Sequence, residues 1–407
     1  MASSSAVATV LEQDAVQTRG SRGAIYAMFA VDGVGFGVWA SFLPAFKASL
    51  GVSDGGLSIP LFAMVVGSLL SMPAAGRVMA RRGSRGVVLA SGAAYSGILP
   101  LIALAAVAPG GLPLFTLAAL AFGASKGALD VSANAQAIAV ERGGGRPIVA
   151  SCHGCWSLGL LCGSVLAGVA LRLGVPPLAA ALVAGLALLV WSVAASNRLG
   201  TDDRPESGAE GRATLWPRGR LLSLAVLAFF ALFCEGAMGD WGAVYLAGEV
   251  GVSASSAAFG YSAYATAMTA GRFAGDRLVA RLGAAALLRS SALLVAAGLG
   301  AALLLRTYPA ALGGFALVGV GLANMIPVIY RSAGRDHGAG GAIASVATVG
   351  SLGFLIGPPV IGALSRAAGL SRALGVVVAF AVMIAACARF AAERGRERPD
   401  VSNAEGN

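Results

Sequence analysis

Arginine and lysine are distributed unevenly along this chain, and their distribution constrains the fold more than any other feature. Long apolar runs divide the 407 residues into twelve hydrophobic segments and thirteen connecting or terminal pieces. The odd-numbered pieces, counted from the N-terminus, contain 23 of the 29 basic residues, the even-numbered pieces contain five, and Lys126 alone falls inside a segment. Because short loops rich in Lys and Arg stay cytoplasmic, this alternation predicts twelve membrane crossings with both termini in the cytoplasm.

The composition agrees with a chain that is embedded in a membrane along most of its length. Hydrophobic residues make up 57% of the sequence, charged residues make up 12%, and the mean hydropathy is +0.79. The uncharged runs 307–330 and 338–365 each exceed the roughly 20 residues that a helix needs to cross the hydrocarbon core. Backbone polar groups in lipid must be satisfied within each span, so the spans are expected to be helices.

The same sequence argues against several other classes of protein. The net charge is +10, but the basic residues are scattered over seven cytoplasmic pieces without interleaved aromatic residues, which indicates topology signalling and not nucleic-acid binding. All five cysteines lie in apolar segments, so no disulfide framework is expected. The run Cys152-His153-Gly154-Cys155 imitates a metal motif, but the only other histidine is His337, so neither a metal site nor another cofactor is predicted.

The two halves of the chain repeat one another. Ser71–Gly83 matches Gly271–Gly283 without a gap at five of thirteen positions, and Ser157–Gly168 matches Ser351–Gly362 at six of twelve. Each member of a pair occupies the same place in its half. Parallel six-helix repeats related by an axis along the membrane normal form one large transporter plan. We therefore predict an all-α membrane protein with 12 transmembrane helices in two six-helix bundles.

Polar stretches outside the segments set the expected domain boundaries. Residues 1–20 are small and polar, show no cleavable signal peptide, and are expected to be disordered. The expected organisation is a cytoplasmic N-terminal tail at 1–23, a first bundle at 24–197, a cytoplasmic linker at 198–220, a second bundle at 221–392 and a cytoplasmic C-terminal tail at 393–407.

The loop after the second segment reads GRVMARRGSR over Gly76–Arg85. It resembles a signature of the major facilitator superfamily, Gly-x-x-x-Asp-Arg-x-Gly-Arg-Arg. In that family the acid of the signature helps to latch the two halves together on the cytoplasmic side, and here Ala80 stands in its place. The resemblance implies that Asp276, in the corresponding loop of the second half, compensates for the missing acid. The residues assigned to this cytoplasmic gate loop are Gly76, Arg81, Gly83, Arg85, Asp276 and Arg277.

Further strings narrow the resemblance within the superfamily. Similarity to the YbjJ-like bacterial permeases and, more distantly, to the fucose-permease-like sugar symporters is carried by the strings at 123–142, 153–159, 235–246, 271–278, 324–335 and 353–362. The resemblance extends over about residues 24–392. It implies transport by alternating access between the two halves.

Ionisable side chains inside the spans are the candidates for function, because each costs about 2.5–3.5 kcal/mol at a helix centre unless it faces a partner or a cavity. A rise of about 1.5 Å per residue places Asp32, Asp130 and His153 at similar levels in the cytoplasmic half. Lys126 and Asp130 are four residues apart and can face each other on one helical stripe, which Asn134 continues. The pair is either a structural device that lets the helix insert or a charge network that exchanges partners when a proton or substrate binds.

The seventh segment adds two more acids. Glu235 is the stronger candidate for the cavity, and Asp240 is either a cavity residue or a cap near the periplasmic end. Trp39 and Trp241 are expected in the interfacial aromatic belt, whereas Trp156 is expected to line the cavity. The residues assigned to proton coupling and the substrate cavity are Asp32, Lys126, Asp130, Asn134, His153, Trp156, Glu235 and Asn324.

These observations predict a secondary active transporter that moves a small polar, sugar-like solute and is coupled to protons. Efflux of a drug-like or metabolite compound by proton antiport, and a receptor that does not transport, are the alternatives. No enzyme is predicted, because the sequence has no P-loop and the pair His153 and Ser157 lacks an oxyanion-hole motif. We expect a monomer in the inner membrane, with the bilayer, protons and a small-molecule substrate as its partners.

Overall fold

The computed structural model describes residues 2–144, 148–200, 217–334 and 339–391, without the side chains of 2–20, 142–144, 150, 276, 339–341 and 344. Every regular element in that part of the chain is helical. The elements are α1 (Ala2–Leu50), α2 (Asp54–Arg82), α3 (Arg85–Val107), α4 (Gly111–Gly144), α5 (Val149–Arg172), α6 (Pro177–Ser196), α7 (Arg220–Gly248), α8 (Ala254–Leu282), α9 (Ala284–Leu305), α10 (Tyr308–Ala323), α11 (Met325–Gly334), α12 (Ala339–Ala368), α13 (Leu370–Cys387) and the 3₁₀ helix η1 (Ala388–Ala391).

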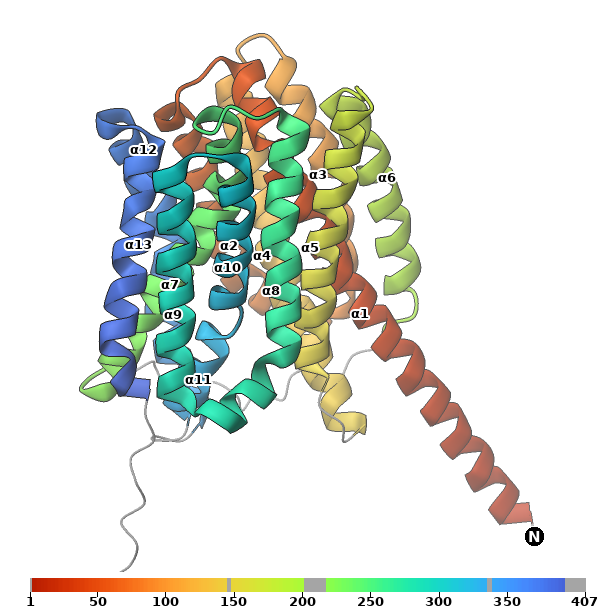
Figure 1. The fold of residues 1–407 in the computed structure, drawn as a ribbon. Helices are drawn as coiled ribbons and strands as arrows, with labels where there is room; N and C mark the ends of the chain where they lie inside the picture. Colours follow the sequence, from red (N-terminus) through yellow and green to blue (C-terminus); the bar gives the residue numbers. More distant parts are fainter. Residues whose placement is uncertain (1, 145–147, 201–216, 335–338, 392–407) are drawn as a thin grey trace, which may run out of the picture.

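Twelve spans form the bundle, as the sequence predicts. Within the described residues, eleven stretches are long and apolar enough to cross a membrane, and α10 and α11 share one of them, Tyr308–Gly334. The twelfth span is α8, which is 29 residues long and packs along α5 (Figure 1). Its arginine and hydroxyl side chains make it more polar than the others. The all-α architecture with two six-helix bundles, α1–α6 and α7–α13, is therefore confirmed.

The order of the helices separates two ends of the bundle. The turns at Ser84 and Gly283 lie at one end, together with the last residues of α6 and the first residues of α7; we call it the arginine-rich end. The turns after Leu50, at 108–110 and at 173–176 lie at the opposite end. Contacts between the two halves run mainly along α5 against α8 and along α2 against α12.

The first helix is longer than the sequence indicates. Residues 2–20, which were expected to be disordered, continue α1 beyond its membrane span. This extension projects away from the bundle at the arginine-rich end (Figure 1). The expectation of disorder was wrong for the backbone, because the small residues of this stretch include many alanines and no proline, so helix propagation meets no steric break.

The tenth span is interrupted between α10 and α11. Pro327 has no N–H to donate to the carbonyl of Ala323, and its ring would crowd that carbonyl in a regular helix. The break falls at Asn324, whose backbone φ and ψ are −115° and −1°. A polar residue therefore stands where the backbone of this span is least satisfied by its own helix.

Glycine lets α1 and α5 approach closely. A Cβ at Gly37 would overlap the backbone of Leu160, and a Cβ at Gly163 would overlap the backbone of Val34. Small residues allow such close backbone contact between membrane helices. The contact brings the middle of α5, including Trp156, next to α1.

We predict that Gly163→Ala lowers the melting temperature of the purified protein in detergent, because its Cβ would push α1 and α5 apart. Overpacking of this kind costs about 1–3 kcal/mol. Gly97→Ala in α3 is the matched control, because nothing lies within 4 Å of its Cβ position, and there alanine favours the helix by about 0.5–1 kcal/mol. Equal melting temperatures for the two variants would contradict the close packing of α1 on α5.

Candidate functional site

One lysine joins two carboxylates between α1 and α4. The Nζ atom of Lys126 lies 2.8 Å from Oδ2 of Asp32 and 3.1 Å from Oδ2 of Asp130. Lys126 and Asp130 are one turn apart on α4, so the predicted pairing along that stripe is confirmed, and the fold adds Asp32 from α1. Two acids thus share one cation. If both acids are ionised, the group carries an uncompensated negative charge in the interior of the bundle.

Asp32 is the most enclosed member of this group, with a side chain that is 3% exposed. Its Oδ2 accepts a second hydrogen bond, 2.8 Å long, from Nε1 of Trp156. Its Oδ1 is buried and has no hydrogen-bond partner among the described residues. The hydroxyl of Tyr95 donates to the backbone oxygen of Asp32 at 2.8 Å, which fixes this turn of α1. A buried carboxylate oxygen without a partner is unfavourable, so this position favours a proton or a hydroxyl donor on Oδ1.

Glycine explains how Trp156 reaches Asp32. The residue next to the acid, Gly33, faces the backbone of α5 at Trp156, and a Cβ at Gly33 would overlap that carbonyl oxygen. On α4, Gly127 allows an equally close approach to α2, where a Cβ at this position would overlap the carbonyl oxygen of Ser68. The acid, the lysine and the indole are thus brought together by small residues that adjoin them in sequence.

A second cation, Arg272 of α8, lies across the boundary between the halves. Its Nη1 donates to Oγ of Ser157 on α5 at 2.6 Å, and its Nη2 lies 3.3 Å from Oε1 of Glu235 on α7. The side chains of Arg272 and Glu235 are 22% and 18% exposed. The count of basic residues by piece assigns Arg272 to a loop between two hydrophobic segments. This assignment was wrong, because the residue lies ten positions before the end of α8.

A signal for Arg272 was present in the repeat. In the gap-free match between the two halves, Arg272 corresponds to Met72, so its charge is not part of the repeated loop signature. An unrepeated arginine just before a repeated loop indicates an interior role. The sequence gives no signal that Ser157 contacts Arg272, because a hydroxyl in a membrane helix usually bonds to the backbone of its own helix. It does so here as well, to His153 at 3.0 Å.

Trp156 links the two charged groups. The Lys126 ammonium lies 5.8 Å from the centre of the indole ring, and the Arg272 guanidinium carbon lies 5.6 Å from it. Cations at this distance are attracted to an indole face. One aromatic side chain therefore contacts a cation from each half of the protein, which places Trp156 at the junction of the two bundles.

The other three predicted cavity residues bond to backbone atoms or pack on a ring. The Asn134 amide donates at 2.8 Å to the backbone oxygen of Asp130 in its own helix. The imidazole of His153 is exposed and meets the Phe29 ring edge-on at 5.3 Å. Asn324 is buried, and its amide donates to the backbone oxygen of Gly271 at 2.8 Å, so it ties the break in the tenth span to α8. These contacts are local or structural.

The structure corrects the expected place of two tryptophans and excludes one of the two alternatives for Asp240. Trp39 and Trp241 are fully buried and do not lie in an interfacial belt. Trp39 stacks on Phe115 at 5.7 Å, because aromatic rings of the first bundle enclose it on this side. Asp240 does not cap a helix end: it is 5% exposed and lies eight residues before the end of α7.

The gate-loop residues lie at the arginine-rich end. Gly83 ends α2 with φ of +81°, which glycine adopts without strain. Arg85 donates to the backbone oxygen of Asn197 at 3.4 Å, so it ties α3 to α6 within the first half. Arg81 and Arg277 are exposed, and Gly76 has nothing within 4 Å of its Cβ position. The side chain of Asp276 lies outside the described residues.

No group of three or more His, Cys, Asp or Glu side chains that could hold a metal ion occurs among the described residues. The chemistry that this arrangement supports is the exchange of protons and hydrogen bonds by three carboxyl groups, an ammonium and a guanidinium around one indole.

Comparison with known proteins places this arrangement in a family. A family model described as Major Facilitator Superfamily matches residues 25–337. The chain belongs to the major facilitator superfamily. An uncharacterised transporter of this superfamily from Yersinia pestis is 35% identical over 387 residues, which cover 94% of this chain and 99% of the relative. Membrane protein MosC from Rhizobium meliloti is 33% identical over 350 residues, which cover 85% and 84%.

Solved structures share the superfamily fold at low sequence identity. The nucleoside transporter NupG has a TM-score of 0.67 and 12% identity, covering 90% of this chain and 97% of that one. A bacterial homologue of the human lysosomal transporter Spinster has a TM-score of 0.69 and 16% identity, covering 91% and 96%. The E. coli fucose:proton symporter FucP has a TM-score of 0.59 and 17% identity, covering 92% and 98%.

We predict that Lys126→Ala destabilises the protein by about 3–5 kcal/mol, because it leaves buried carboxylates without their cation. Adding Asp32→Asn should recover more of this loss than adding Asp130→Asn, since the two acids are 3% and 33% exposed. Melting of the three variants in detergent at neutral pH measures the difference. Equal recovery by the two asparagines would show that burial of Asp32 does not set the cost.

Proposed function

We propose that this protein is a proton-coupled secondary transporter that moves a small polar, sugar-like solute by alternating access. The observation that carries the proposal is the lysine shared between Asp32 and Asp130. Two acids with one cation have room for one proton in the interior of the membrane. Net transfer of that proton from one side to the other is what coupling to a proton gradient requires.

The two acids are suited to different parts of this cycle. Asp130 is one-third exposed, so a proton can reach it from water, whereas Asp32 is enclosed and bonded to both Lys126 and Trp156. When Asp130 takes a proton, Lys126 pairs with Asp32 alone. When Asp130 loses it, the ammonium is shared again. The position of Lys126, and with it the polar surface offered to a solute, therefore depends on the proton.

The chemistry of the surrounding groups favours a polar solute. Hydroxyl groups of a solute can donate to the partly exposed carboxylate of Asp130 and accept from Lys126 and Arg272, while a face of C–H groups can stack on Trp156. A purely apolar compound would leave these groups desolvated without partners, which is costly. This argument depends on the charged residues alone, since the distant solved structures carry the fold and no substrate.

Contacts between the halves support one state of the alternating-access cycle. Three hydrogen bonds across the boundary lie near the opposite end: Ser255 Oγ to Gly168 O at 3.1 Å, Ser262 Oγ to Ser164 Oγ at 2.9 Å, and Ser365 Oγ to Asp54 Oδ2 at 2.6 Å. The bond from Arg272 to Ser157 lies nearer the middle. By the distribution of basic residues, the arginine-rich end is cytoplasmic, so we infer that this state is closed toward the periplasm.

The experiment that tests the function begins with a ligand screen. Monosaccharides, nucleosides and sugar acids are added to the purified protein, and compounds that bind the folded state raise its melting temperature. A labelled hit is then offered to proteoliposomes with and without a pH gradient. Uptake at the same rate with and without the pH gradient would contradict proton coupling. Binding of the compound without uptake would favour a receptor that does not transport.

We predict that Asp130→Asn abolishes gradient-driven accumulation of the hit compound and leaves counterflow exchange partly intact. Asparagine keeps the shape of the side chain but cannot carry the proton, whereas exchange moves the solute in both directions without net proton transfer. Asn134→Ala is a control on the same helical stripe, because that amide bonds only to its own helix. Undiminished accumulation by Asp130→Asn would take this acid out of the coupling role.

We predict that Ser365→Ala shifts the protein away from the state closed at the periplasmic end, because Asp54 loses its hydrogen bond across the boundary and keeps only its ion pair with Lys47 in its own half. Cysteine pairs placed across α2 and α12 at that end should crosslink more slowly. Ser351→Ala, whose hydroxyl bonds to its own helix, is the control on α12. A crosslinking rate equal to that of the control would show that this bond does not hold the gate.

The gate-loop role of Asp276 stays a prediction. Its neutralisation in Asp276→Asn was expected to favour opening toward the cytoplasm, and the same crosslinking assay at the arginine-rich end tests it.

A further inference from the structure

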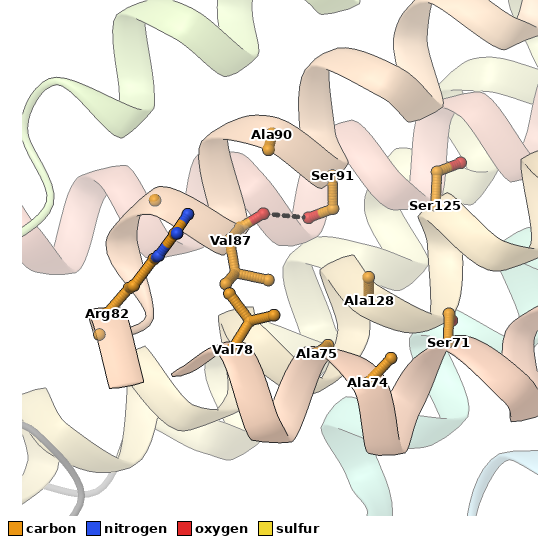
Figure 2. A pocket seen from close by; sticks show the side chains of 12 residues that line it. Ser71, Ala74, Ala75, Val78, Arg82, Val87, Ala90, Ser91, Ser125 and Ala128 are labelled. Atoms are coloured by element: carbon orange, nitrogen blue, oxygen red, sulfur yellow. Dashed lines mark hydrogen bonds between the residues drawn. The ribbon is translucent and has the colours of Figure 1, made fainter. Parts of the chain in front are cut away.

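A groove of about 480 Å³ lies between α2, α3 and α4 near the arginine-rich end, outside the charged network (Figure 2). Small and apolar side chains dominate its walls, and α4 forms its floor. Its lining residues are Ser71, Ala74, Ala75, Val78, Arg82, Gly83, Gly86, Val87, Ala90, Ser91, Ser125 and Ala128.

The groove opens on the outer surface of the first bundle. Ala74, Val78 and Ala90 are exposed along its rim, and the neighbouring Leu70 and Leu89 are 71% and 36% exposed. Leucines that project outward from a membrane span face hydrocarbon. The occupant of this groove is therefore drawn from the lipid phase and not from water.

The polar groups in the groove offer almost nothing to a polar ligand. The hydroxyl of Ser71 donates to the backbone oxygen of Ser68 at 2.9 Å, and that of Ser91 donates to Val87 at 2.6 Å, as Figure 2 shows. The hydroxyl of Ser125 donates to Phe122 at 2.8 Å. With these donors directed to their own helices, the walls present an apolar surface.

The mouth of the groove is cationic. Arg82 lines it at the end of α2 and is exposed, and Arg77 and Arg81 are exposed on the same helix end. The sequence contains no Asp or Glu between Asp54 and Asp130, because the acid of the loop signature is replaced by Ala80. Positive charge at the end of a membrane span, without acids nearby in sequence, attracts anionic head groups.

The second half lacks this combination. In the repeat, Arg82 corresponds to Leu282 and Gly76 corresponds to Asp276, so residues 276–283 have two arginines and one acid where residues 76–83 have three arginines and no acid. The cation at the mouth of the groove is thus particular to the first half, and the second half provides a matched reference within one molecule.

We propose that the groove binds an anionic phospholipid of the surrounding leaflet, with an acyl chain along α2, α3 and α4 and its phosphate on Arg82. The floor residues Ser125 and Ala128 flank Lys126 in sequence, on the helix that carries the shared cation. A lipid in the groove therefore packs against α4 from outside the bundle, on the helix that holds the charged network.

The test measures lipid binding to the delipidated full-length protein in detergent by native mass spectrometry. Dioleoyl-phosphatidylglycerol is expected to bind at least about tenfold more tightly than dioleoyl-phosphatidylcholine. Arg82→Gln should remove most of this preference, and Ala90→Trp, which fills the groove from an exposed position, should weaken both lipids. Arg281→Gln, an exposed arginine in the equivalent loop of the second half, should leave binding unchanged.

Melting of each variant without added lipid controls for folding, and a variant that melts early is replaced by Arg82→Ala or Ala74→Phe. The proposal is overturned if the two phospholipids bind the wild type with equal affinity. It is overturned as well if Arg281→Gln loses as much affinity for phosphatidylglycerol as Arg82→Gln does, or if Ala90→Trp binds both lipids as tightly as the wild type. It is also overturned if oleate binds as tightly as phosphatidylglycerol, since a free fatty acid would then be the occupant.

Discussion

The structure depends on one largely buried cation that is shared between two carboxylates. Lys126 lies in the middle of a membrane helix and is bonded to carboxylates on two helices. An isolated ammonium there would cost several kcal/mol, so α1, α4 and α5 must be close enough for the acids and the indole to surround it. Glycines beside these residues, such as Gly33 and Gly127, permit that approach. Helix packing in the first bundle and the charged site thus have one physical cause.

The second bundle also pairs a largely buried cation with a carboxylate, but it uses different residues. Its first helix, α7, contributes Glu235, as α1 contributes Asp32, but its cation comes from α8, where the first half has Met72. Arg272 also bonds to Ser157 of the first half. The two charged groups therefore meet at Trp156, and a solute that displaces either cation changes the contact between the halves. The repeated sequence gives the two halves the same helical framework, and the unrepeated Arg272 links one half to the other.

Much of the fold could be predicted from the sequence, because the number and direction of membrane spans depend on where apolar and basic residues occur along the chain. Runs without charge and the alternation of arginine fix the twelve spans, and spacing by four residues fixes the pairing of Lys126 with Asp130. The ion pair of Asp32 with Lys126 was not predictable in detail, since it depends on how close α1 and α4 approach. The place of Trp39 was mistaken because a tryptophan near a span end suits both the membrane interface and an aromatic core.

The ties between the halves at the closed end are few and weak, and this is what a transporter of this kind requires. Three hydrogen bonds involving hydroxyls, each with a net contribution of about 0.5–1.5 kcal/mol, amount to a few kcal/mol in all. Under the proposed function, a proton that redirects Lys126, or a solute that occupies Arg272, has only to favour the other state by a comparable amount, because about 1.4 kcal/mol changes a population ratio tenfold. Stronger ties, such as several buried ion pairs across α2 and α12, would hold one state against any ligand. The placement of full charges at the centre and of hydroxyls at the gate therefore lets the centre control the gate.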